Sequence, residues 1–211
     1  MLTPEQVAET RRLAAKVPFH FDLAGFNAVL GRPFDHRQVI AATTYQSAAT
    51  ALDHMQRSID SYADALGFAA APATFHAACV MYAGDSPLLA LDDAMYAKYP
   101  VAVIIEREMN PGNPLYAERA KEMRTNLSGS QYRRLVAEHG ASFFVCNNAF
   151  SGLAYEIARA ITPQGTAVKR DHVVSLHDEL AAHFLPGTML APNGVGALNA
   201  VQEAHFTFLP G

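Results

Sequence analysis

The chain has 211 residues, a length that a single α/β domain can reach around one hydrophobic core. Half of the residues are hydrophobic and 17% are charged, which argues against a disordered polypeptide, and the net charge of −4 provides no basic surface for nucleic acid or an anionic membrane. The two cysteines, Cys79 and Cys146, argue against a disulfide framework and favour a cytoplasmic location.

Residues 1–30 are predicted to form a helical extension. "MLTPEQVAETRRLAAK" places Pro4 between Thr3 and Gln6, which is typical of a capped helix start, and it lacks the apolar segment of a signal peptide. The next stretch, 17–33, is expected to be irregular because proline and glycine interrupt it. No stretch of the chain approaches the roughly 20 apolar residues of a membrane span, so no membrane association is expected.

Residues 31–211 are predicted to form one α/β domain in which strands and helices alternate. We expect strands at 36–45, 74–83, 141–146, 188–192 and 205–210, and helices at 46–66, 84–99 (after a turn), 130–140, 149–161, 170–184 and 193–204. This alternation predicts a three-layer α/β/α sandwich around a mainly parallel sheet of about five strands. The unbroken apolar runs in 74–83 and 141–146 predict that these two strands are central.

One part of this domain does not follow the alternation. Residues 101–107 fit either a strand or a loop. Residues 108–130 are polar and interrupted by proline and glycine, so we interpret them as an insertion or lid in the domain.

Candidate binding residues follow the predicted strands, because ligands of open α/β sheets bind beyond the carboxyl ends of the strands. They are Tyr45, Gly84, Asp85, Ser86, Asn147, Asn148, Asn193 and Gly194. Helix N-termini at these turns could hold an anion. The alternative is that they are ordinary connections, since short polar turns precede helices in most α/β proteins.

Cys146 is the candidate catalytic residue, because it stands where a predicted strand meets a predicted helix. Backbone N–H groups at a helix N-terminus favour the thiolate and would make this cysteine a nucleophile. The alternative is that Cys146 is a small packing residue, as many free cysteines are. Cys79 lies within an apolar run and is expected in the core.

No motif predicts a metal or another cofactor. The spacings of five and six between His172, His177 and His183 do not place them on one helical face, so we expect surface histidines. HExxH, CxxC, the P-loop and the complete GxGxxG fingerprint are all missing from the sequence.

Three segments together resemble the DsrE/DsrF-like family of sulfur-relay proteins, over roughly residues 34–210. They are "AEHGASFFVCNNAFSGLA" (137–154), "LPGTMLAPNGVGALNAVQEAHFTFL" (185–209) and "GDSPLLALDDAMYAKYP" (84–100). The resemblance implies that Cys146 carries a persulfide, that the partners are sulfur donor and acceptor proteins, and that the chain forms a homo-oligomer such as a trimer or hexamer. The apolar edge strand "HFTFLP" would suit such an assembly.

The chain departs from the family pattern in two places. Ser151, Gly152 and Leu153 stand where relay proteins carry arginines after the cysteine, and Ala83-Gly84 stands where many relatives have His-Gly. Two hypotheses therefore stay open. The chain either handles sulfane sulfur through Cys146, or it is a noncatalytic small-molecule-binding or assembly protein in which Cys146 is a packing residue.

Overall fold

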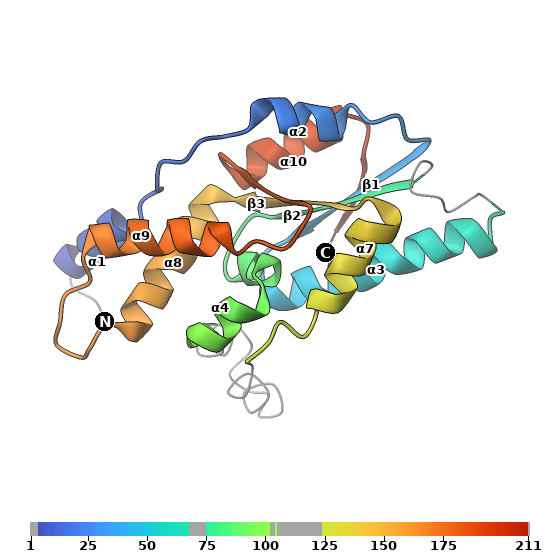
Figure 1. The fold of residues 1–211 in the computed structure, drawn as a ribbon. Coiled ribbons are helices and arrows are strands. Elements are labelled where there is room, and N and C mark those ends of the chain that lie inside the picture. Colours follow the sequence, from blue (N-terminus) through green and yellow to red (C-terminus); the bar gives the residue numbers. More distant parts are fainter. Residues whose placement is uncertain (1–3, 68–74, 102–103, 105–123, 211) are drawn as a thin grey trace.

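The computed structural model describes residues 4–67, 75–101, 104 and 124–210 (Figure 1). It is an α/β protein in which five parallel strands form one sheet in the order β4-β3-β2-β1-β5. The strands are β1 (His36–Ala42), β2 (Phe75–Met81), β3 (Ser142–Cys146), β4 (Thr188–Ala191) and β5 (Thr207–Pro210). Because β2 and β3 each have a strand on both sides, the prediction that they are central is confirmed.

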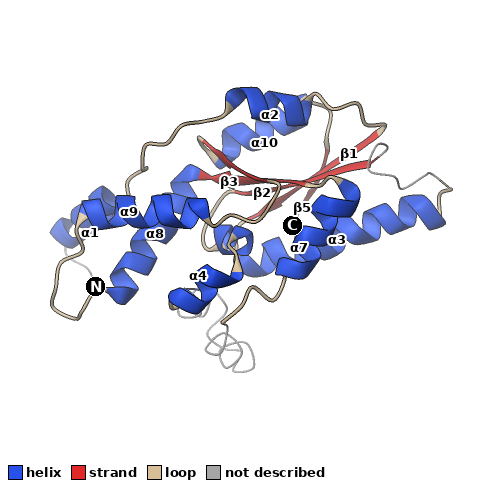
Figure 2. Ribbon diagram, viewed as in Figure 1, coloured by secondary structure: helices blue, strands red, loops and turns tan. Residues whose placement is uncertain are grey.

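Helices cover both faces of this sheet, so the predicted three-layer α/β/α sandwich is confirmed (Figure 2). On one face lie α2 (Leu23–Leu30) and α10 (Gly194–Glu203). On the other face lie α1 (Pro4–Leu13), α3 (Tyr45–Asp64), the short 3-10 helix η1 (Ser86–Ala90), α4 (Asp93–Lys98), α7 (Gly129–His139), α8 (Asn147–Ile161) and α9 (Arg170–Ala182).

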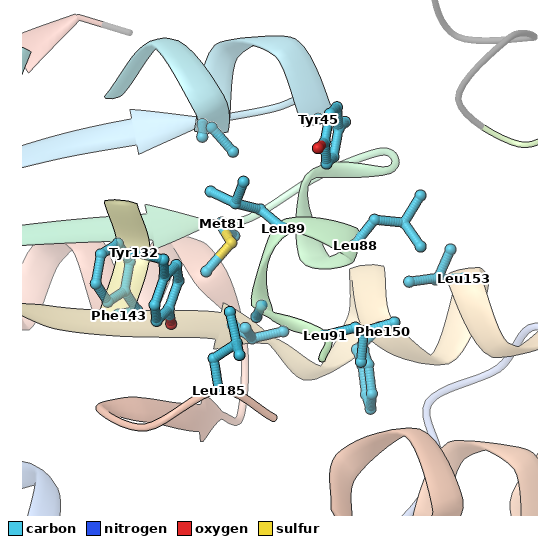
Figure 3. Close-up of a cluster of buried hydrophobic side chains, with 14 of the residues drawn as sticks. Tyr45, Met81, Leu88, Leu89, Leu91, Tyr132, Phe143, Phe150, Leu153 and Leu185 are labelled. Carbon is cyan, nitrogen blue, oxygen red and sulfur yellow. The ribbon is translucent and has the colours of Figure 1, made fainter. Parts of the chain in front are cut away.

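Each face of the sheet has its own hydrophobic core, because successive side chains of a strand point to opposite faces. On the α3 face, Met81 of β2 and Phe143 of β3 are fully buried, and the ring of Tyr132 from α7 stacks on Phe143 with 3.8 Å between ring centroids (Figure 3). On the α10 face, Phe26 of α2 packs edge-on against Phe144, with 5.1 Å between ring centroids. The residues of the unbroken apolar runs seen in the sequence are therefore buried alternately in one core and in the other.

The expectation that 17–33 is irregular is wrong, because α2 forms within it. The Asp22 side chain accepts a hydrogen bond from the backbone N–H of Gly25 at 2.8 Å and so caps the first turn of α2. Phe26 is 5% exposed. A cap and a buried aromatic side chain therefore outweigh the low helix propensity of Gly25.

The segment that interrupts the alternation lies partly outside the described residues. Val101 and Ile104 are buried in the core on the α3 face. The predicted insertion at 108–130 falls outside the described residues up to 123. At its carboxyl end, Asn126 is buried and its Nδ2 donates to the carbonyl oxygens of Leu89 and Leu91, each at 2.8 Å. The chain is thus fixed to the body of the domain just before α7 begins.

Candidate functional site

The parallel strands bring two of the predicted site residues together at the carboxyl edge of the sheet. Asp85, in the turn after β2, is 2% exposed, and its Oδ1 accepts a hydrogen bond of 2.8 Å from the backbone N–H of Tyr45. Tyr45 is the first residue of α3, so the carboxylate lies at the positive end of a 20-residue helix. Gly84 provides the left-handed backbone of this turn with φ of 53°, and the Ser86 hydroxyl donates to the Ala83 carbonyl oxygen at 2.6 Å.

A pocket of about 240 Å³ opens beside Asp85, and we call it the α1–α8 pocket. Its described lining consists of Thr10, Ala14, Gly84, Asp85, Ile104, Ala149, Gly152, Leu153, Tyr155 and Glu156. One wall therefore comes from α1, which belongs to the predicted N-terminal extension, and another from α8. The lining combines apolar side chains with a few polar groups, as is typical of small-molecule sites.

Asn147 was predicted to line a crevice, but its side chain lies in the core and joins three segments of the chain. It is fully buried in the first turn of α8. Its Nδ2 donates to the Val17 carbonyl oxygen at 2.7 Å, and its Oδ1 lies 2.8 Å from Nε2 of His177. Ser151 completes the group, since its hydroxyl accepts the Val17 N–H at 2.9 Å. Asn148, the next residue of α8, is exposed.

Two buried histidines were missed by sequence reasoning. His177 is 1% exposed, so the expectation of surface histidines is wrong for it, and burial lowers its pKa. The signal was present, because His177 follows Val173 by four residues and precedes Leu180 by three, which places it on the buried face of α9. His76 in β2 is fully buried, and its Nε2 lies 2.9 Å from the Ser142 hydroxyl.

Cys146 is the last residue of β3 and directly precedes α8, as the sequence predicted. It is 4% exposed. On the α10 face it meets Gly194, where a Cβ atom would lie 3.0 Å from Cβ of Cys146 and 2.1 Å from Cβ of Tyr82. Only a glycine lets the first turn of α10 approach the cysteine this closely. Cys79 is fully buried in β2, and burial raises the pKa of its thiol to about 12.

Asn193 and Gly194 lie on the opposite face of the sheet from the α1–α8 pocket. The Asn193 side chain caps α10 by accepting the Gly196 N–H at 2.5 Å. Asn193 also lines a pocket of about 230 Å³ with Phe21, Phe26 and residues of α10. The predicted residues are thus divided between two faces of the sheet, and one crevice does not collect them all.

The arrangement allows small-molecule binding at the carboxyl edge, and it places Cys146 beside the N-termini of α8 and α10. Among the described residues, no group of three or more His, Cys, Asp or Glu side chains could hold a metal ion. In the same part of the chain, none of the helices is both long enough and apolar enough to cross a membrane.

Comparison with family models, with curated proteins and with solved structures finds no match to this chain. The resemblance to the DsrE/DsrF-like family therefore stays a prediction.

Proposed function

We propose that this chain is a noncatalytic small-molecule-binding protein whose ligand occupies the α1–α8 pocket. The observation that carries the proposal is the buried carboxylate of Asp85, which lines this pocket at the carboxyl end of a central parallel strand. Ligands of open α/β sheets bind at this edge. A carboxylate taken out of water is costly, and such groups gather at functional sites.

The surroundings of Asp85 fix it as a polar anchor. The Tyr45 N–H holds one carboxylate oxygen, and the N-terminus of α3 favours its negative charge. Ala14, Ile104 and Leu153 supply apolar surface around it. A largely apolar pocket of this size, with Asp85 among its few polar groups, suits a ligand built around a single ring, since a cavity of about 150 Å³ already holds benzene.

The test uses three probes that share one ring and differ in charge: benzylamine, benzoate and benzyl alcohol. Binding is measured by ligand-observed NMR on the wild type and on Gly152→Leu, which fills the pocket. Gly152 suits this purpose because a Cβ there meets no atom within 4 Å. Ala160→Leu is the matched control, since it adds the same side chain at an exposed position of the same helix.

We expect at least one probe to bind the wild type and Ala160→Leu, and to lose binding in Gly152→Leu. The preferred charge would then identify the ligand class. Absence of binding for all three probes, or equal binding to all three proteins, would contradict the proposal.

A second candidate function is that Cys146 carries sulfane sulfur. It is favoured by the position of Cys146 at the start of the 15-residue helix α8 and against the first residue of α10. In this reaction the Cys146 thiolate attacks the outer sulfur of a donor persulfide. A new S–S bond forms on Cys146, the donor S–S bond breaks, and the donor leaves as a thiolate. Its partners would be sulfur donor and acceptor proteins.

Incubation with a persulfide donor, followed by mass spectrometry, separates this function from packing. A sulfur carrier should gain one sulfur in the wild type and in Cys79→Ser, and none in Cys146→Ser. If the wild type gains none, or if Cys146→Ser is loaded like the wild type, Cys146 is a packing residue.

A further inference from the structure

A larger pocket, of about 570 Å³, lies at the amino ends of the strands, and we call it the β1–β5 pocket. Its lining includes His36 and Gln38 of β1, Ser58 and Tyr62 of α3, Phe75 of β2 and Thr207 of β5. In Figure 1 the carboxyl end of α3 lies at the right end of the molecule, whereas α1 and α8 lie at its left end. This pocket is therefore separate from the α1–α8 pocket, and no predicted site residue lines its described part.

Gln38 is an unusual residue for its place in the sheet. It lies on the α3 face with Ile40 and Ala42, next to the fully buried Val39, and is itself only 6% exposed. Within the described part of the chain, its Nε2 has no hydrogen-bond partner. Buried amide groups normally have partners, because leaving one unpaired is costly. The orphaned amide of Gln38 thus indicates that a ligand supplies the missing acceptor.

Aromatic rings from three elements line the same pocket as this amide. The ring centroids of His36 and Tyr62 are 4.7 Å apart, and those of Tyr62 and Phe75 are 5.0 Å apart. Such rings provide flat apolar surface on which another ring can stack. Ser58 of α3 and Thr207 of β5 contribute hydroxyl groups to the same lining.

The one arginine of the described lining, Arg37, has both of its terminal nitrogens engaged with backbone carbonyl oxygens. They donate to Ala204 at 2.6 Å and to Arg32 at 3.2 Å. Asp35 adds a carboxylate to the lining, so the pocket disfavours an anionic ligand. The Gln38 amide and the hydroxyls of Ser58 and Thr207 supply hydrogen-bond donors and acceptors that suit an uncharged ligand.

We propose that the β1–β5 pocket binds an uncharged planar heterocycle that stacks on the aromatic rings and pairs an adjacent donor and acceptor with the Gln38 amide. A glutamine amide matches the N6 and N7 edge of adenine in this way. The inference is independent of the proposed function, because the two pockets lie at opposite edges of the sheet.

The test measures binding of adenine and of indole by ligand-observed NMR at millimolar concentration. Indole has a similar shape but lacks the adjacent acceptor. The variant is Gln38→Leu, which removes the amide, and the matched control is Gln202→Leu, at an exposed position of α10 outside the described lining. Thr207→Phe, which narrows the pocket from an exposed position, is a second variant in case Gln38→Leu does not fold.

We expect the wild type and Gln202→Leu to bind adenine more tightly than indole. Gln38→Leu should lose about tenfold in affinity for adenine and should no longer discriminate between the two probes. Thr207→Phe should bind neither. The proposal is overturned if the wild type does not bind adenine, or if the affinity for adenine is the same in Gln38→Leu and in Thr207→Phe as in the wild type.

Discussion

At the scale of single residues, two helical glycines have opposite roles. A Cβ on Gly194 would lie 2.1 Å from Cβ of Tyr82, so Gly194→Ala forces α10 away from the sheet and should cost about 1–3 kcal/mol of unfolding free energy. A Cβ on Gly152 meets nothing within 4 Å, so Gly152→Ala should stabilise α8 by about 0.5–1 kcal/mol. Chemical denaturation measures both. Changes of the same sign in the two variants would contradict this account.

His76 should make the stability of the protein depend on pH. Burial, assisted by the nearby charges of Arg32 and Arg37, lowers its pKa to about 4, from an ordinary value of about 6.5. The folded state thus binds a proton less readily than the unfolded state. The unfolding free energy therefore has its full value, as far as His76 is concerned, above about pH 6.5. It decreases as the pH falls towards about 4.

Between pH 7 and about pH 5, His76 should lower the unfolding free energy of the wild type by about 2 kcal/mol. Over the same interval His76→Gln, which keeps a polar partner for Ser142, should lose about 2 kcal/mol less unfolding free energy than the wild type. Chemical denaturation at each pH measures this difference. His177 is buried in the same way and contributes in the same direction, so some pH dependence should persist in the variant. Equal pH dependence in both proteins would show that His76 does not control it.

The site could be predicted only in part, because sequence position does not reveal where a side chain points. The turn after β2 was predicted to hold site residues, and it does bring Asp85 to the N-terminus of α3. Asn147 follows β3 in the same manner, yet it is buried and bonded to Val17 and His177. Those two residues are 130 and 30 positions away in the sequence, and no local pattern indicates such pairing.

At the scale of elements, side chains of α8 and α9 hold the segment that follows α1. Ser151 and Asn147 of α8 bind the N–H and carbonyl oxygen of Val17, which is fully buried. Arg170 of α9 donates to the carbonyl oxygens of Leu13 at 2.6 Å and of Lys16 at 3.1 Å. These bonds position α1 as a wall of the α1–α8 pocket.

Ser151→Ala should weaken this attachment, because it leaves the buried N–H of Val17 without an acceptor. We expect a loss of about 1–3 kcal/mol in unfolding free energy and faster hydrogen exchange at the Val17 amide. Ser61→Ala, at an exposed position of α3, is the matched control and should change stability by less than about 0.5 kcal/mol. If the Val17 amide exchanges at the same rate in Ser151→Ala and in the wild type, the attachment does not depend on this hydroxyl.

The regular elements were predicted well where a single periodicity extends over many residues. The central strands β2 and β3 read as unbroken apolar runs, and α3 has apolar residues at three- and four-residue spacings, so these elements were found. The eight-residue helix α2 was missed because its stability comes from contacts of Phe26 with Phe144, on a strand more than a hundred residues later. The local sequence of α2 does not indicate that contact.

At the scale of the whole molecule, the sheet separates the candidate binding regions. The α1–α8 pocket and the Asn193 pocket lie at the carboxyl edge on opposite faces, and the β1–β5 pocket lies at the amino edge. The carboxyl-edge regions were anticipated, because the rule for open α/β sheets concerns that edge. The amino-edge pocket was not, since it depends on how β5, from the end of the chain, pairs with β1.

The prediction that the chain forms a homo-oligomer also belongs to this scale. β5 forms one edge of the sheet, and its Phe208 and Leu209 are 40% and 36% exposed. An exposed apolar edge strand readily pairs with another chain. If copies associate through β5, the wild type should sediment as an oligomer, and Phe208→Lys should sediment as a monomer because a charge would then be buried between copies.

Leu66→Lys, at a position 58% exposed beyond α3, is the control and should remain oligomeric. A wild type that is monomeric at all concentrations would contradict the oligomer, and an oligomeric Phe208→Lys would exclude β5 as the contact.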